Sequence, residues 1–403
     1  MRILFTIGRY WPAIGGAETL VRELASRLAC SGEVTAVCLA NSNEADFLGS
    51  LRKPAQPHSY RDGRTEVRLL NASGARSVLL EGYIQLACRS RWAAAQASLF
   101  AATYRSQLED LVRGAELVHS LPAMSLPLVR LTAQVARRRK VPFVVTPHLH
   151  GAAEAVQLRD VFSCAAGIIA LTSVEREWIS AAGVPAEKIE VIGLGQTVVP
   201  AEETGRFRAR YELSGPMILF IGRMESHKGY RQLLAAAPLV WREEPKAHFV
   251  FIGPGTPQSQ RVFRDYRRER RIIEIAARGE EVKNEALTDC DLLCLPSTKE
   301  SFGHVLLEAW AAGKPVIAAD IPVERAIISP GEDGLLVEQA PEAVAEAILR
   351  LVKNPQLARE MGARGRAKVL REYSWERVAA RTLACYERIV RERSVAGCPS
   401  AAC

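Results

Sequence analysis

Short apolar runs alternate along the chain with longer amphipathic stretches. The runs contain few polar residues, which is typical of strands that are buried on both faces of a parallel sheet. This alternation predicts an α/β protein with doubly wound parallel sheets. The predicted strands are residues 2–7, 33–40, 116–120, 141–146, 167–171, 188–192, 216–221, 248–252, 272–275, 291–295, 316–319 and 334–337.

The strand and helix pattern is interrupted once near the middle of the chain. Residues 193–205 are rich in Gly, Pro and small residues and show no periodicity, after which the pattern restarts. A chain of 403 residues is long enough for two domains of about 200 residues. We therefore expect a first domain over residues 1–195, a second over 196–375, and a terminal helix with a frayed tail over 376–403. The polar segment 41–64 predicts a loop, and the predicted helices include residues 17–29, 84–113, 280–287, 303–313, 323–328, 341–351, 355–372 and 374–393.

One stretch of the second half joins a buried strand, a loop and a helix. Glu300 stands in the loop, and Glu308 stands inside the helix, roughly 8 Å further along its axis. Between them, the backbone N–H groups near Phe302, Gly303 and His304 have no helical acceptor and favour a phosphate. Two carboxylates beside a phosphate suit a ligand rich in hydroxyl groups, and a sugar nucleotide has this layout. Two solvated glutamates beside an ordinary helix are the alternative interpretation.

The order Glu300-x-Phe302-Gly303, with Glu308 beyond it, resembles the E-x7-E motif of the retaining nucleotide-sugar glycosyltransferases of the GT-B fold, the group 1 glycosyl transferases. The resemblance implies two Rossmann-like domains facing a central cleft, with an acceptor side in residues 1–195 and a donor side in residues 196–375. It also implies a terminal helix that crosses back to the first domain. The resemblance covers nearly the whole second half but only two short segments of the first.

Two more segments of the second half are similar to the same family. In Gly222-Arg223-x4-Lys228-Gly229, the guanidinium can contact phosphate oxygens with two N–H groups, and the ammonium adds a compact charge. The spacing matches the Arg and Lys that hold the donor diphosphate in the resembled family; two solvated bases in a loop are the alternative. Gly253 lies in a turn that resembles a family loop near the nucleotide.

In the first half, Gly15 and Gly16 can bring backbone amides close to a phosphate. Together with the two residues after them they resemble the family loop that contacts donor and acceptor, whereas a G-x-G-x-x-G fingerprint is not formed. His148 follows the strand 141–146 and resembles the histidine that hydrogen-bonds the donor sugar, with His150 as the runner-up. Residues 194–197 are Leu-Gly-Gln-Thr where relatives usually show Asn-Gly-Val-Asp, so the role of that turn stays open.

The charge of the chain limits which partners it can bind, and its cysteine content indicates the compartment. The 53 basic and 45 acidic residues give a net charge of +8, which suits anionic acceptors, an anionic membrane surface, or solubility alone. Residues 261–271 are densely basic, but acidic residues interrupt them and aromatic residues are few. This favours an exposed helix over nucleic-acid binding. The nine cysteines form no CxxC pair, which indicates a cytoplasmic protein without a zinc site.

Membrane insertion and metal binding receive little support from the sequence. No run of about 18 apolar residues predicts a membrane span, and residues 1–7 indicate a strand rather than a signal peptide. Asp289-Cys290-Asp291 contains a D-x-D pattern, but it precedes a strand instead of following one. The expected localisation is the cytoplasm, and peripheral contact with the inner face of the plasma membrane stays open.

The resemblance implies an enzyme that moves a hexose from a UDP- or GDP-sugar to an acceptor hydroxyl with retained anomeric configuration. Arg223, Lys228 and the helix amides would stabilise the departing diphosphate, so neither a metal ion nor a cofactor is expected. Glu308 would hold the ribose, Glu300 the sugar hydroxyls, and His148 the 6-hydroxyl side. A front-face reaction is implied, in which the leaving phosphate accepts the proton of the acceptor.

Several alternatives remain open from the sequence alone. The acceptor can be a polysaccharide, a lipid-linked glycan, a protein or a small molecule, and the donor base and sugar are not fixed. A nucleotide-sugar epimerase or hydrolase of the same fold is a second hypothesis. A nucleotide-sugar-binding protein without turnover is a third. A NAD-linked oxidoreductase is disfavoured by the missing fingerprint.

Overall fold

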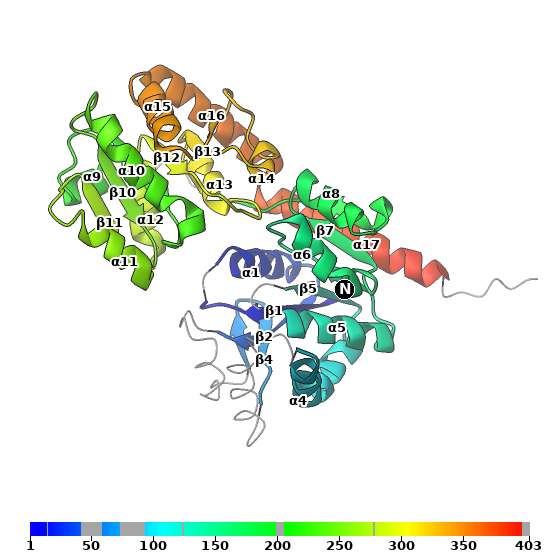
Figure 1. Ribbon diagram of the computed structural model, residues 1–403. Helices are drawn as coiled ribbons and strands as arrows, with labels where there is room; N and C mark the ends of the chain where they lie inside the picture. Colours follow the sequence, from blue (N-terminus) through cyan, green and yellow to red (C-terminus); the bar gives the residue numbers. More distant parts are fainter. Residues whose placement is uncertain are drawn as a thin grey trace, which may run out of the picture. The chain divides into compact units, whose positions relative to one another are not determined.

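The computed structural model describes residues 1–13, 15–41, 59–72, 93–122, 125–198, 205–276 and 279–396. The chain divides into two compact units, of which unit 1 contains Met1–Gly193 with Trp375–Cys403 and unit 2 contains Leu194–Ser374. Each unit has its own sheet, flanked by helices (Figure 1). The predicted α/β class is therefore confirmed. The last seven residues of the predicted frayed tail lie outside the described residues.

The sheet of unit 1 has the strand order β3-β4-β2-β1-β5-β6-β7-β8. All neighbouring strands are parallel except the pair β3 and β4, which is antiparallel. The order reverses between β1 and β5, so the loops after these two strands lie where open α/β sheets bind ligands. The strands are β1 (Arg2–Arg9), β2 (Glu33–Ala40), β3 (Ser59–Asp62), β4 (Thr65–Leu69), β5 (Leu117–Leu121), β6 (Phe143–Val145), β7 (Gly167–Ala170) and β8 (Ile189–Val191).

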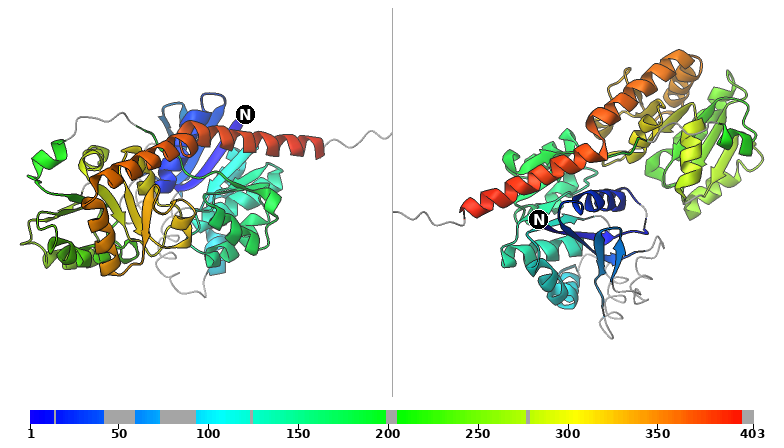
Figure 2. Two further views of the ribbon diagram at one scale, coloured as in Figure 1. Left: turned by 90° about the horizontal axis from the view of Figure 1, so that it is seen from above. Right: turned by 180° about the vertical axis from the view of Figure 1, so that it is seen from behind.

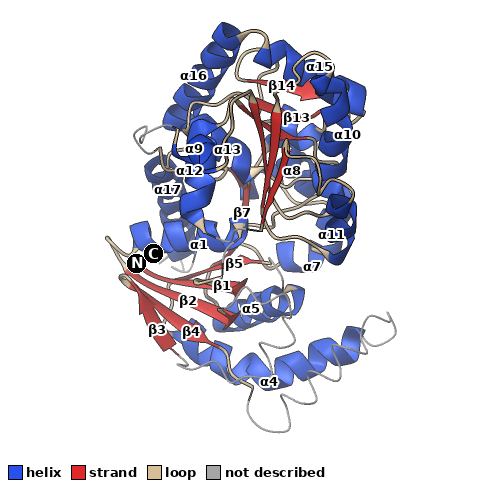
Figure 3. Ribbon diagram, turned by 90° about the vertical axis from the view of Figure 1, so that its left-hand side faces the viewer, coloured by secondary structure: helices blue, strands red, loops and turns tan. Residues whose placement is uncertain are grey.

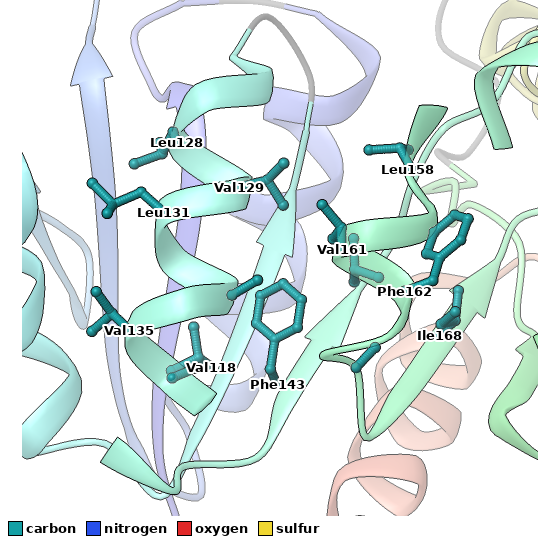
Figure 4. Packing of buried hydrophobic residues seen from close by; sticks show 14 of the residues in the cluster. Val118, Leu128, Val129, Leu131, Val135, Phe143, Leu158, Val161, Phe162 and Ile168 are labelled. Atoms are coloured by element: carbon teal, nitrogen blue, oxygen red, sulfur yellow. The ribbon is translucent and has the colours of Figure 1, made fainter. Parts of the chain in front are cut away.

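Helices pack apolar faces onto the sheet of unit 1. In Figure 4, Val135 of α5 lies near Val118 of β5, with Phe143 of β6 on the other side of Val118, and all three side chains are buried. Burial of such side chains supplies the main stabilisation of the unit. The helices of unit 1 are α1 (Gly16–Leu28), α4 (Ala93–Arg113), α5 (Leu126–Arg139), α6 (Ala152–Gln157), α7 (Arg159–Phe162), α8 (Ser173–Ala181), the 3-10 turn η2 (Ala186–Lys188) and α17 (Trp375–Ala396).

The chain returns to unit 1 through its terminal helix. Helix α17 packs against α1 and is one continuous helix (Figure 2). Its Ile389 side chain approaches β7 so closely that a β-carbon on Gly167 would lie 2.6 Å from Ile389 Cδ1. This contact ties the terminal helix to a strand from the middle of the chain in one folded unit.

The sheet of unit 2 has the strand order β11-β10-β9-β12-β13-β14, and every described pair is parallel. Helices cover both of its faces (Figure 3). The strand order reverses between β9 and β12, which places the loops after these strands at the ligand-binding edge. The strands are β9 (Met217–Ile221), β10 (His248–Ile252), β11 (Ile272–Ile275), β12 (Leu292–Leu295), β13 (Val316–Ala319) and β14 (Gly334–Val337). The helices are α9 (Arg206–Arg210), η3 (Ser226–Lys228), α10 (Tyr230–Trp241), α11 (Pro257–Arg264), α12 (Glu280–Asp289), α13 (His304–Ala311), α14 (Pro322–Arg325), α15 (Pro341–Val352) and α16 (Pro355–Glu372).

Two element predictions were wrong. The polar segment 41–64, predicted as a loop, contains β3, because Ser59–Asp62 pairs antiparallel with Thr65–Leu69 and completes an edge hairpin. Residues 42–58 of the same segment lie outside the described residues. The basic segment 261–271 is not one exposed helix, because α11 ends at Arg264 and turns lead from there into β11. The start of the predicted helix 84–113 lies outside the described residues up to residue 92, and α4 covers the rest.

Candidate functional site

The loops after β9 and β12 meet in a buried ion pair. Lys228 Nζ donates to both carboxylate oxygens of Glu300 at 2.8 Å. The Glu300 side chain is only 6% exposed, and Ser297 Oγ donates to its Oε1 at 2.8 Å. The sequence placed Lys228 and Glu300 on different parts of a ligand, and the structure brings them together as direct partners.

Backbone contacts fix the two loops against each other. Gly229 has a φ of 82°, and a β-carbon there would lie 2.1 Å from the carbonyl oxygen of Pro296. A side chain at residue 229 would therefore collide with the loop after β12. The N–H of Thr298 also donates to the carbonyl oxygen of His227 at 2.8 Å. The ion pair is thus held by a rigid junction of two loops.

Arg223 lies on the same loop as Lys228 but is more open to solvent. Its side chain is 61% exposed, and its Nη1 lies 3.0 Å from Glu225 Oε1. The pKa of His227 is lowered by burial first and then by Lys228, with a smaller contribution from Arg223. Both cations therefore disfavour the charged form of the same imidazole.

The turn after β10 touches the Arg223 loop. A β-carbon on Gly253 would lie 2.1 Å from the carbonyl oxygen of Gly222, and the N–H of Met224 donates to the carbonyl oxygen of Pro254 at 3.0 Å. The structure thus brings the predicted nucleotide turn beside the predicted diphosphate loop.

Helix α13 begins at the turn that the sequence singled out. Gly303 precedes the helix in a left-handed conformation, with a φ of 78°. Phe302 is buried with its ring 5.7 Å from that of Tyr373, which anchors the turn. His304 Nε2 donates to the carbonyl oxygen of Gly195 at 3.2 Å. The turn with the unusual Leu-Gly-Gln-Thr sequence therefore contacts the start of α13.

Glu308 is one turn further along α13 and has a partner that the sequence did not reveal. Lys283 Nζ of α12 lies 2.8 Å from Glu308 Oε1 and 2.8 Å from Glu280 Oε2. Burial lowers the pKa of Lys283, but the two carboxylates outweigh that effect and the net shift is upward. The spacing of Glu280 and Lys283 predicts only a helical ion pair, and no local pattern links Lys283 to Glu308.

In unit 1, His148 lies in a strained turn after β6. Its φ of 55° is uncommon for a residue with a side chain, and such strained residues cluster at functional sites. Glu175 holds the turn by accepting hydrogen bonds from the N–H groups of Leu149 and Leu171. Burial raises the pKa of Glu175 to about 7, although these two N–H groups oppose the rise. His150 is 40% exposed and lies 3.5 Å from Glu154.

A buried polar network lies next to the His148 turn. His119 of β5 bonds through Nδ1 to Tyr386 of α17 and through Nε2 to Thr146 Oγ1 at 2.8 Å. Burial and, to a smaller extent, the charge of His148 lower the pKa of His119 to about 3. A neutral imidazole therefore links β5, the end of β6 and the terminal helix.

Gly15 and Gly16 form the start of α1 in unit 1. Gly15 is the N-cap, and a β-carbon on it would lie 2.3 Å from Glu18 Oε2. Glu18 is buried and pairs with Arg9 Nη2 at 2.8 Å. The sequence did not identify Arg9, which lies at the end of β1 and ties the glycine loop to the strand.

The D-x-D segment has a structural role. Asp289 accepts hydrogen bonds from the N–H groups of Gly205, Phe207 and Arg208 at 2.5, 2.8 and 3.1 Å, so it caps α9. Asp291 pairs with Arg208 Nη2 at 2.6 Å. Across the described residues, no group of three or more His, Cys, Asp and Glu side chains is arranged to hold a metal ion. No described helix has the length and apolar composition that crossing a bilayer requires.

Each half of the chain matches the model of a known protein family. Residues 15–195 match the family model described as the glycosyl transferase 4-like domain, and residues 202–368 match glycosyl transferases group 1. Phosphatidyl-myo-inositol mannosyltransferase of Mycobacterium tuberculosis is 30% identical over 247 residues, 58% of this chain and 62% of that protein. D-inositol 3-phosphate glycosyltransferase of Corynebacterium glutamicum is 29% identical over 227 residues, 52% of this chain and 54% of that protein. The chain thus spans less than two thirds of the length of these curated relatives.

Solved structures share the fold over almost the whole chain. Anabaena Alr3699/HepE in complex with UDP and glucose has a TM-score of 0.72 at 19% identity, covering 95% of this chain and 99% of that one. Sucrose-phosphate synthase from Thermosynechococcus elongatus has a TM-score of 0.72 at 20% identity, covering 97% and 99%. The fold is that of the GT-B glycosyltransferases. Within this class, residues 202–368 belong to the group 1 glycosyl transferases and residues 15–195 to the glycosyl transferase 4-like domains.

Proposed function

We propose that the chain transfers a hexose from a UDP- or GDP-linked donor to an acceptor hydroxyl with retention of the anomeric configuration. The Lys228–Glu300 pair carries this proposal, because an ammonium suited to a diphosphate lies 2.8 Å from a carboxylate suited to sugar hydroxyls. A sugar diphosphate presents these two chemistries on either side of the bond that breaks. Membership of the group 1 glycosyl transferases supports the class of reaction.

The departing diphosphate would be held by Lys228, Arg223 and the start of α13. The Lys228 ammonium has three N–H donors, and the two oxygens of Glu300 accept from two of them, so the third can donate to a phosphate oxygen. The exposed guanidinium of Arg223 can form a two-pronged contact. The N–H groups at Gly303 and His304 would add the positive end of the helix dipole. These groups act where negative charge develops, so the reaction needs no divalent cation.

The two glutamates would bind the two sugars of the donor. Glu308 contacts Lys283 through Oε1, and we assign its other oxygen to the ribose hydroxyls. Glu300 lies with Lys228 and Ser297, and we assign it to the hydroxyls of the transferred hexose. This division follows the order ribose, diphosphate and hexose along a nucleotide sugar.

The chemistry would proceed on one face of the hexose. The bond between C1 and the phosphate oxygen breaks, a bond from C1 to the acceptor oxygen forms on the same face, and the departing phosphate takes the acceptor proton. We assign His148 to the 6-hydroxyl side of the hexose, and its left-handed backbone supports a functional role. We assign Gly15 and Gly16 to a loop that contacts donor and acceptor, as the resembled family loop does.

The acceptor is proposed as a polyol, glycan or lipid-linked hydroxyl compound. Two relatives are named for phosphatidyl-myo-inositol and D-inositol 3-phosphate, so inositol compounds belong in the acceptor panel. We propose a cytoplasmic location with peripheral contact to anionic lipid, supported by the net charge of +8.

A thermal-shift screen with UDP-, GDP- and ADP-sugars tests donor binding, because a bound ligand raises the apparent stability. Turnover with the donor that binds is then followed by nucleotide release in the presence of inositol compounds, glycans and lipid-linked acceptors. We expect release that depends on an acceptor and persists with EDTA, and NMR should show a product with the anomeric configuration of the donor.

The same experiment separates the alternatives. Altered sugar or free sugar formed without an acceptor indicates an epimerase or a hydrolase. Tight binding without any nucleotide release indicates a binding protein. Absence of binding to every nucleotide sugar would refute the proposed function.

A further inference from the structure

Glu324 is a buried acid beside the proposed donor site. It lies on α14, directly after β13, whose neighbour in the sheet is β12. Its side chain is fully buried, and within the described part of the chain neither carboxylate oxygen has a hydrogen-bond partner. Leaving a buried carboxyl unsatisfied lowers stability, so the position of this group calls for a functional explanation.

The Glu324 carboxyl lies against the turn that begins α13. A β-carbon on Gly303 would lie 3.0 Å from Glu324 Oε1 and 3.4 Å from Oε2. Burial and the charge of Glu300 raise the pKa of Glu324 well above its usual range, while Lys228 opposes the rise. The neutral acid is therefore favoured, and it does not compete with an anionic ligand for the positive end of the helix.

We propose that Glu324 is a positioning residue for the donor diphosphate, because its buried carboxyl braces the Gly303 turn whose N–H groups hold the phosphate. This inference rests on the proposed function. The turn has a left-handed glycine and little room beneath it, so a change in the volume or polarity below the glycine displaces its N–H groups. An amide of the same size keeps the volume below the turn without adding a charge, whereas a shorter side chain leaves a cavity there.

Isothermal titration of UDP, GDP and the matching monophosphates tests this role. Glu324→Ala should weaken binding of the preferred diphosphate about tenfold, since the displaced Gly303 turn loses one hydrogen bond from its N–H groups to the phosphate, and should change monophosphate binding less than twofold. Glu324→Gln should stay within about threefold of the wild type. The matched control is Val323→Ala, which truncates a buried side chain of the same helix and should leave diphosphate binding unchanged.

Circular dichroism and thermal unfolding show whether each variant folds, and Glu324→Met replaces the alanine variant if that one does not. Wild-type diphosphate affinity in the folded alanine or methionine variant would overturn the inference. A loss of diphosphate affinity in Glu324→Gln or in Val323→Ala as large as that in Glu324→Ala would also overturn the inference. If the wild type binds none of the nucleotides, the proposed function itself fails, and the inference fails with it.

Discussion

Lys228→Ala separates the proposed catalytic role of the Lys228–Glu300 pair from its structural role. The substitution removes an ammonium that lies 2.8 Å from both oxygens of Glu300. If Lys228 stabilises the departing diphosphate, its loss should reduce kcat by about 10²–10³-fold, as for other donors to a developing negative charge. The KM for the donor should change less, because the contact strengthens in the transition state.

Lys228→Ala should lower the free energy of unfolding by less than the loss of a fully buried ion pair would. Breaking a buried pair costs about 3–5 kcal/mol, and an exposed pair contributes about 0–1 kcal/mol. The Lys228 side chain is 20% exposed, and Glu300 keeps its hydrogen bond from Ser297, so we expect a loss of about 1–3 kcal/mol. Urea unfolding measures this value, and turnover is assayed with the donor identified by thermal shift.

A second variant decides between the two roles. Lys228→Ala combined with Glu300→Gln removes the unpaired charge, so stability should recover in part while turnover should not. Lys353→Ala is the control, because it removes a lysine of a solvent-exposed pair with Glu243 and should leave both properties unchanged. A kcat within tenfold of the wild type in folded Lys228→Ala, or recovery of turnover in the double variant, would refute the catalytic assignment.

Three further predictions concern the rest of the donor site and the core of unit 1. Glu308→Gln should weaken UDP or GDP binding about tenfold, and Lys283→Met by a smaller factor, as measured by titration; unchanged affinity in both would contradict the ribose assignment. Gly229→Ala should lower the free energy of unfolding by about 1–3 kcal/mol or more, because the new β-carbon would lie 2.1 Å from the Pro296 oxygen; urea unfolding at wild-type stability would contradict this. The pKa of His119 is lowered to about 3, so its contribution to stability is complete above pH 6.5 and is lost as the pH falls towards 3. Between pH 6.5 and 4.5, the free energy of unfolding of His119→Gln should therefore fall by about 2–3 kcal/mol less than that of the wild type. Parallel curves of unfolding free energy against pH would contradict the lowered pKa.

The sequence predicted those structural elements of the proposed donor site that local patterns encode. The apolar run 292–295 predicted a strand, Gly303 predicted a turn, and the apolar periodicity after it predicted a helix. The structure has β12, the Gly303 turn and α13 in that order. Contacts between distant residues left no such signal. The direct pairing of Lys228 with Glu300 joins residues 72 positions apart, and that of Glu308 with Lys283 joins two helices. Both ion pairs depend on how distant segments pack, and the hydrophobic periodicity of the sequence does not encode such packing.

The charges of the donor site indicate how a donor would be attracted. Arg223, Lys228 and Lys283 lie within 3.0, 2.8 and 2.8 Å of the carboxylates of Glu225, Glu300 and Glu308, respectively. Each cation is therefore matched by an acid, and the field of the site falls off over a short distance. Capture of a diphosphate would depend on exchange of hydrogen bonds at close range and on the N–H groups of the Gly303 turn. We therefore expect fixed backbone geometry at that turn to matter more for binding of the proposed donor than the net basic charge of the chain.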